Sequence, residues 1–165
     1  MQQGNAAEII HWAAFLAHYV ADAHQPLHTV LNYDGQLTGN DGIHSRYETG
    51  MLRIYMHEYQ YTPIEVPPVE DLLDYAFHIL LESYQLTDQI IVADDAAVRG
   101  MSRAAIRQLQ EYWKTDRDSL YFARLYARVD EMTWEWLQKA TARLAAFYTA
   151  AWENAGKPEL PVPSE

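Results

Sequence analysis

The sequence contains no cysteine among its 165 residues. Disulfide bonds and thiolate metal sites are therefore excluded, and any zinc ion must be held by histidine and carboxylate side chains. There is also no apolar run long enough to cross a bilayer, so we expect no membrane span. The first residues carry no basic region typical of a signal peptide, which predicts either a cytosolic protein or one whose leader has been removed.

Basic residues are scarce. The chain has 12 Lys and Arg against 23 Asp and Glu, which gives a formal net charge of −11. This balance disfavours non-specific binding to nucleic acid, because such binding depends on Lys and Arg contacts to phosphate. It does not exclude a nucleotide substrate, since bound divalent cations reverse the local field at a site.

What is present is the pattern of an all-α protein, with no convincing strand and no internal repeat. We predict a single helical metal-binding domain over 1–156 and an extended, proline-containing tail over 157–165. Helices are expected over 6–25, from about His44 to Tyr55, from about Val69, from Ser102, and over 119–154 as one helix or as two that break near Asp130.

The connecting segments follow from glycine and proline. Residues 32–43 are rich in Gly, Asn and Asp and predict a loop, and 61–68 predicts a connector because it contains three prolines. Gly100 is expected to stop the helix that begins near Val69, or the segment after it, and Gly156 to cap the last helix.

Two helices have marked apolar patterns. Apolar residues almost encircle 6–25, which predicts a buried helix rather than a surface one, ending or kinking at Pro26. The helix from Val69 has an apolar stripe with helical spacing, formed by Leu72, Leu73, Ala76, Phe77, Leu80 and Leu81.

Candidate metal ligands are concentrated between His18 and Glu48, a window that holds four of the seven histidines. His18 and Asp22 are four residues apart and share a helix face, and His44 and Glu48 repeat this spacing. His28 lies just past Pro26, where the chain can turn toward either pair. Imidazole and carboxylate ligands suit zinc, with manganese or iron as alternatives, and three protein ligands leave a position open for water.

Each pair taken alone is more typical of a surface ion pair or a buried structural histidine than of a ligand pair. The combination with His28 and the glycine-rich loop favours metal binding. His24 lies on a different helix face from His18, so we interpret it as a polar surface residue or as a partner of a ligand. His11, His57 and His78 are interpreted as structural.

The run HYVADAHQPLH, from His18 to His28, resembles the signature of the zinc-dependent phospholipase C and nuclease P-one family. The loop 38–41 resembles that of the nuclease branch, whereas Glu48 as the last ligand resembles the phospholipase branch. The resemblance covers about residues 9–52, and 143–146 resembles the family's last helix.

The resemblance implies a multi-helix fold of that family and up to three zinc ions. His28, His44 and Glu48 match the complete ligand set of one zinc. His18 and Asp22 match two of the four ligands of a second zinc, and Asp22 also matches the carboxylate that bridges to a third. The remaining ligands of the family come from a first half that has no counterpart in this chain.

The implied activity is phosphodiester hydrolysis, with a phospholipid or a single-stranded nucleic acid as substrate. The residues do not identify the catalytic base. A partner chain or a second copy of the chain would have to supply the missing ligands. The family resemblance implies a secreted or periplasmic protein.

Three alternatives are weighed against this hypothesis. The first is a non-catalytic helical domain that keeps one zinc for stability or interaction. The second is a ferritin-like di-iron bundle, of whose two Glu-x-x-His motifs only 8–11 is present. The third is a helical interaction domain without metal.

Overall fold

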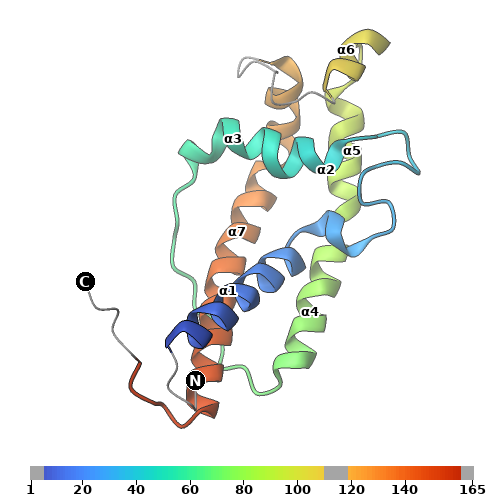
Figure 1. Ribbon diagram of the computed structural model, residues 1–165. Helices are drawn as coiled ribbons and strands as arrows, with labels where there is room; N and C mark the ends of the chain where they lie inside the picture. The colour runs from blue at the N-terminus through green and yellow to red at the C-terminus, as the bar shows by residue number, and fades with distance from the viewer. Residues whose placement is uncertain (1–5, 110–118, 161–165) are drawn as a thin grey trace.

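The protein is all-helical. The computed structural model describes residues 6–109 and 119–160, and these contain helices and no strand. The prediction of an all-α fold is thus confirmed. Along the chain (Figure 1) the elements are α1 (Ala6–Ala23), the 3-10 turn η1 (Pro26–Thr29), α2 (Ile43–Ser45), the π-helical turn η2 (Arg46–Met51), α3 (Leu52–Tyr55), the 3-10 turn η3 (Met56–Glu58), α4 (Leu72–Tyr84), α5 (Thr87–Ala97), α6 (Arg103–Gln108) and α7 (Leu120–Asn154).

Several boundaries lie where local chemistry predicts them. Ser102 caps α6, its hydroxyl accepting a hydrogen bond from the Ala105 amide at 3.1 Å. Gly156 follows α7 with a φ of 85°, and its amide donates to the Glu153 carbonyl, as in a glycine C-cap. The predicted tail is described only over 157–160, which has no regular secondary structure; 161–165 lies outside the described residues.

The sequence leaves two points open: where the helix from Val69 ends, and whether the last helix breaks near Asp130. The chain turns at Gln85 and Leu86, so that α4 and α5 are separate helices although no glycine or proline marks the break. The last helix does not break near Asp130: α7 runs for 35 residues without interruption. At 1.5 Å per residue it is about 52 Å long.

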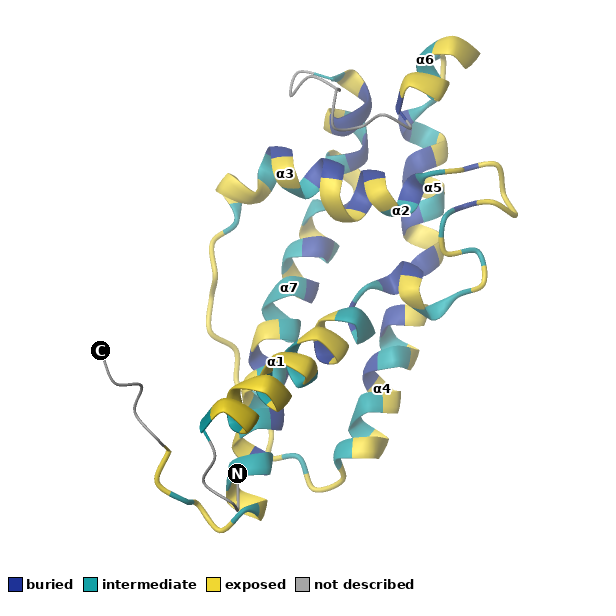
Figure 2. Cartoon of the chain, viewed as in Figure 1, coloured by how far each residue is buried: buried dark blue, intermediate teal, exposed yellow. Residues whose placement is uncertain are grey.

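The buried apolar side chains form two clusters. Figure 2 shows how buried and exposed positions are distributed along the helices. The larger core joins η1, α2, η2, α3, α5 and α7, and its completely buried members include Leu27, Ile43, Met51 and Phe122. The smaller core lies where α1 and α4 meet α7, and its buried members are Val20, Ile79 and Phe147. α7 is thus the helix that contributes to both cores.

The prediction that the first helix is buried is wrong. Among the residues of α1 only Val20 is buried, whereas Ile10, Trp12 and Tyr19 are 63%, 66% and 64% exposed. On α4 the apolar stripe is also only partly covered, because Leu73, Phe77 and Leu81 are exposed. The apolar pattern identified helices correctly, but α1 and α4 meet the rest of the described chain along one face each. No described helix has the length and apolar character needed to cross a membrane.

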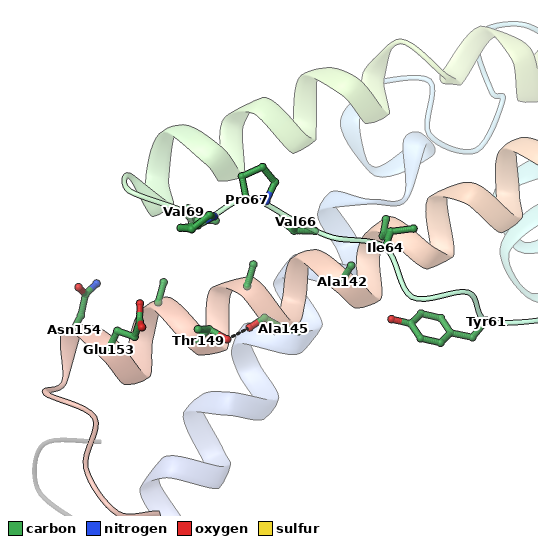
Figure 3. Close-up of a pocket in the computed structure, with 13 residues that line it drawn as sticks. Tyr61, Ile64, Val66, Pro67, Val69, Ala142, Ala145, Thr149, Glu153 and Asn154 are labelled. Atoms are coloured by element: carbon green, nitrogen blue, oxygen red, sulfur yellow. Dashed lines mark hydrogen bonds between the residues drawn. The ribbon is translucent and has the colours of Figure 1, made fainter.

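The predicted connector is confirmed as an irregular segment that runs along the second half of α7. Together they enclose a groove of about 440 Å³ (Figure 3). Its α7 side is formed by small side chains such as Ala142, Ala145 and Thr149, and its other side by Tyr61 and the apolar residues that follow it.

Candidate metal centre

Gln25 and Pro26 determine how the chain leaves α1. The side-chain oxygen of Gln25 accepts a hydrogen bond from the Leu27 amide at 3.1 Å, which caps η1, and Pro26 occupies its first turn, where the missing amide hydrogen is tolerated. Leu27 is completely buried in the larger core. This anchor leaves the neighbouring His28 at the surface of the turn, with its side chain 28% exposed.

The glycine-rich loop returns the chain to η1. Gly35 has a φ of 76°, and a Cβ atom at this position would lie 2.5 Å from the Asn40 carbonyl oxygen. Gly42 has a φ of 83° and immediately precedes α2. Both positions require a conformation that other residues adopt at a cost. The resulting compact loop places His44 beside His28, with their ring centroids 4.9 Å apart.

A buried polar network holds this loop and the following turn against α5 and α7. The guanidinium of Arg46 is 3.1 Å from a carboxylate oxygen of Asp94, and both side chains are 2% exposed. Arg46 also donates to the Tyr121 hydroxyl at 2.8 Å and to the Asp41 carbonyl at 2.6 Å. Asn40 donates to Asp94 at 2.8 Å. The turn that carries His44 and Glu48 is therefore fixed from its buried side.

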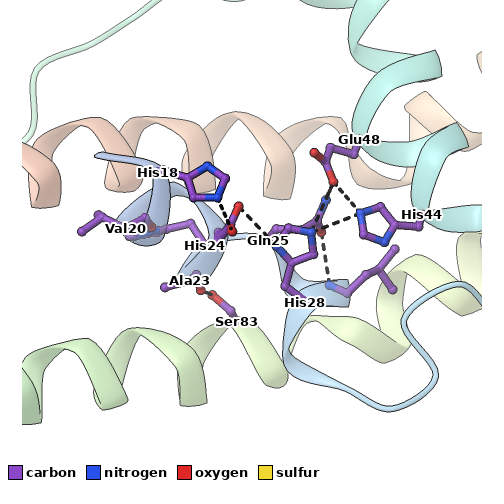
Figure 4. A network of polar contacts seen from close by, with 11 residues as sticks. His18, Val20, Ala23, His24, Gln25, His28, His44, Glu48 and Ser83 are labelled. Atoms are coloured by element: carbon purple, nitrogen blue, oxygen red, sulfur yellow. Dashed lines mark hydrogen bonds and ion pairs between the residues drawn. The ribbon is translucent and has the colours of Figure 1, made fainter. Parts of the chain in front are cut away.

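Three ligand-type side chains converge at the surface of this anchor (Figure 4). The Nε2 atoms of His28 and His44 are 3.1 Å apart. A carboxylate oxygen of Glu48 lies 2.7 Å from Nε2 of His44 and 3.7 Å from Nε2 of His28. Within the described residues, this is the group of histidine and carboxylate side chains whose ligand atoms all lie within 4.8 Å of one another.

The spacing fits a tetrahedral metal ion. Ligand atoms at about 2.0–2.1 Å from zinc with tetrahedral angles lie about 3.3 Å apart. The three observed separations of 2.7, 3.1 and 3.7 Å bracket this value. Two imidazoles and one carboxylate leave a fourth position open, and the Glu48 carboxylate is 43% exposed on that surface.

The other predicted ligands lie beside this cluster without completing a second one. His18 contacts one oxygen of Asp22 at 3.3 Å, and Nδ1 of His28 lies 3.5 Å from the other. His18 is 68% exposed. Asp22 thus faces the ring nitrogen of His28 that points away from His44 and Glu48. This is the position of a carboxylate that orients a histidine ligand through its other nitrogen.

The hydrogen bond between His44 and Glu48 is the main cause of the pKa shifts in the cluster. The Glu48 contact raises the pKa of His44 above its ordinary value, against the opposing effect of burial. The same contact, assisted by a 3.0 Å hydrogen bond from Gln25, lowers the pKa of Glu48. A metal ion needs the neutral imidazole, so protons compete with the ion for His44 and binding is expected to weaken as pH falls.

His24 is buried, so its interpretation as a polar surface residue is wrong. It is 5% exposed, and its Nδ1 is 2.7 Å from the Val20 carbonyl. Its Nε2 faces Arg143 at 3.4 Å, and Arg143 in turn pairs with Glu82. Burial lowers the pKa of His24 to about 4, so the imidazole is neutral near pH 7 and ties α1 to α7.

The remaining histidines lie apart from the cluster. His11 packs its ring against Trp12 and Phe15, with centroid distances of 5.2 and 4.8 Å. His57 contacts the Ile54 carbonyl at 2.9 Å. His78 pairs with Glu82 at 3.3 Å on the exposed side of α4.

Sequence reasoning missed Gln25, Arg46 and Asp94 as supports of the cluster. Gln25 is part of the run from His18 to His28, and its place before Pro26 identifies it as a cap. Nothing local identifies the other two, because Arg46 and Asp94 are 48 positions apart.

A cavity of about 170 Å³ opens beside the cluster. Its lining includes Asp22, His28 and Glu48, together with residues at the end of α1, in η1 and η2, and on one face of α7.

Comparison with known proteins finds no relative of this chain. No family model, no curated protein and no solved structure matches the chain.

Proposed function

We propose that this protein is a zinc-dependent phosphodiester hydrolase with the helical fold of the phospholipase C and nuclease P-one family. The observation that carries the proposal is the convergence of His28, His44 and Glu48 within 4.8 Å, in the segment whose sequence resembles that family. Two imidazoles and a carboxylate with an open fourth position are typical of catalytic zinc sites rather than structural ones.

Each side chain then has a defined role. His28, His44 and Glu48 hold the ion, Gln25 fixes the Glu48 carboxylate through its amide, and Asp22 orients His28 through Nδ1. When bound, zinc lowers the pKa of a coordinated water and neutralises charge on the phosphoryl oxygens. None of the described residues is assigned as the catalytic base.

The substrate is a phospholipid or a single-stranded nucleic acid. The net charge of −11 favours a substrate bound through its phosphoryl group at the metal over one held by many Lys and Arg contacts along a polynucleotide. His18 and Asp22 supply two ligands for a second zinc. A partner chain or a second copy of the chain would provide the others.

A second candidate function is a non-catalytic zinc-binding or interaction domain derived from the same fold. The observation that favours it is the His18–Asp22 pair, which has no third ligand of its own among residues 6–109 and 119–160. One ion held by His28, His44 and Glu48 would then stabilise the turn between α1 and α3.

Elemental analysis of protein purified without added metal tests these proposals. About three zinc ions per chain would support the hydrolase with its ligand sets completed by another chain, whereas about one would fit the isolated cluster. Phosphodiesterase assays on a phospholipid and on single-stranded DNA then separate the two functions, with His44→Ala as the matched inactive control. Absence of zinc after dialysis against the ion would reject both.

A further inference from the structure

The cavity beside the metal cluster has a wall formed by one face of α7. Thr133, Trp136, Leu137 and Ala140 follow one another at helical spacing and all line it. Thr133 and Trp136 are 5% and 8% exposed, so this wall is continuous with the buried part of the protein.

The polar atoms of the walls are already paired within the protein. The Tyr47 hydroxyl lies 3.0 Å from the Thr133 hydroxyl, and the indole nitrogen of Trp136 donates to the Ser83 hydroxyl at 3.1 Å. Leu52 and Leu137 add apolar surface. The cavity therefore presents mainly apolar groups along its length.

The cavity also has a lining of a different character. Asp22, His28 and Glu48 line it as well, and two of them belong to the candidate zinc cluster. A compound bound through an anionic head at the cluster would thus be able to extend an apolar substituent toward α7.

We propose that this cavity is a subsite for a small apolar group, an aromatic ring or a branched chain of about six carbons, carried by the phosphoryl compound that binds at the metal cluster. Its volume of about 170 Å³ matches such a group. A dry apolar cavity of about 150 Å³ is large enough for benzene. The inference rests on the proposed function, because it assumes that the anionic head binds at His28, His44 and Glu48.

Calorimetric titration of the zinc-loaded full chain with two phosphonates tests the subsite. Phenylphosphonate and methylphosphonate have the same anionic head and differ in the group that would enter the cavity. Phenylphosphonate is expected to bind about tenfold more tightly, because its ring leaves water for an apolar site.

Two cavity-filling variants are expected to remove this preference. Ala140→Leu adds an isobutyl group from α7, and Ala21→Leu adds the same group from the end of α1, in case the first variant does not fold. Ala145→Leu is the matched control, because Ala145 lies on α7 but lines the groove beside the connector instead. Methylphosphonate affinity and zinc content should stay unchanged in all three.

The outcomes separate the subsite from the function on which it rests. Equal affinities for the two phosphonates, or a phenyl preference that persists in both folded variants, would overturn the subsite and leave the metal site standing. If zinc-loaded protein binds neither phosphonate, the proposed function and the subsite both fail. A preference that is lost in Ala140→Leu or Ala21→Leu and kept in Ala145→Leu supports the proposal.

Discussion

The two halves of the molecule differ in how completely they are covered. In the larger core, the turn that carries His44 and Glu48 is backed by completely buried residues and by the Arg46–Asp94 ion pair. In the smaller core, α1 buries only Val20 and leaves Trp12 and Tyr19 largely exposed.

The candidate ligands follow this division. His44 and Glu48 belong to the well-packed half and, with His28 at the junction, form a compact set of three. His18 and Asp22 project from α1 and remain a pair. The difference indicates that candidate ligands come together where they rest on a packed support, and that spacing alone does not bring a full set together.

The largest effect is expected from removing the charged anchor of the larger core. Asp94→Ala leaves the Arg46 guanidinium buried without its carboxylate, which should lower the free energy of unfolding by about 3–5 kcal/mol. Urea denaturation measures the loss. The control is Asp95→Ala, since Asp95 is exposed and accepts one hydrogen bond from Asn40. Equal losses in the two variants would show that the anchor is not what holds this half together.

The free energy of unfolding is expected to depend on pH through His24, which lies where the end of α1 meets α7. The pKa of His24 falls from 6.5 to about 4 on folding, so the unfolded chain binds the proton first as pH drops. Its contribution to stability is complete above pH 6.5 and is lost progressively toward pH 4, by about 3 kcal/mol in all. Denaturation between pH 7.5 and 4.5 should show a slope that His24→Gln removes and His78→Gln, on the exposed side of α4, retains. A slope unchanged in His24→Gln would contradict the assignment.

Zinc binding by variants distinguishes the group of His28, His44 and Glu48 from the His18–Asp22 pair. His44→Ala should lose the ion and its stabilisation, which is about 2.7 kcal/mol at a free zinc concentration of 100 times Kd. His18→Ala should keep about one ion per chain, because His18 lies outside the compact set. Elemental analysis and thermal unfolding with and without zinc provide the readouts. Loss of all zinc in His18→Ala would place the ion on α1 instead.

The smallest effect is expected on the uncovered face of α1. Trp12→Ser should change the free energy of unfolding by about 0.5 kcal/mol or less, because the side chain is 66% exposed. Phe147→Ala, in the smaller core, is the contrasting variant and should cost about 3–5 kcal/mol. A large loss in Trp12→Ser would mean that this face is covered in the folded protein.

Local signals in the sequence were sufficient for much of the fold. Ser102 and Gly156 marked helix ends, the glycines of 35–42 marked the loop, and helical spacing found α1 and α4. The compact His28, His44 and Glu48 group was also expected, as what the family resemblance implies, whereas spacing left open which pair His28 would join.

The remainder depended on contacts between distant residues. Apolar periodicity shows that α1 is a helix but not which side meets a neighbour, so its exposure could not be predicted. Arg46 meets Tyr121 across 75 positions, and His24 meets Arg143 across 119. The break between α4 and α5 arises at Gln85 and Leu86, residues that helices normally accept.

The long α7 also sets the order in which the protein can be completed during synthesis. All five candidate ligands lie within 18–48, so the ribosome makes them early. The Thr133 hydroxyl that meets Tyr47, Arg143, which meets His24, and Tyr148, which donates to the Ala13 carbonyl, are made about a hundred residues later. A nascent chain therefore exposes its histidines and carboxylates before the helix that supports them exists. The contacts that Tyr121 and Thr133 make with Arg46 and Tyr47, beside the candidate ligands, can form only after this part of α7 has been made.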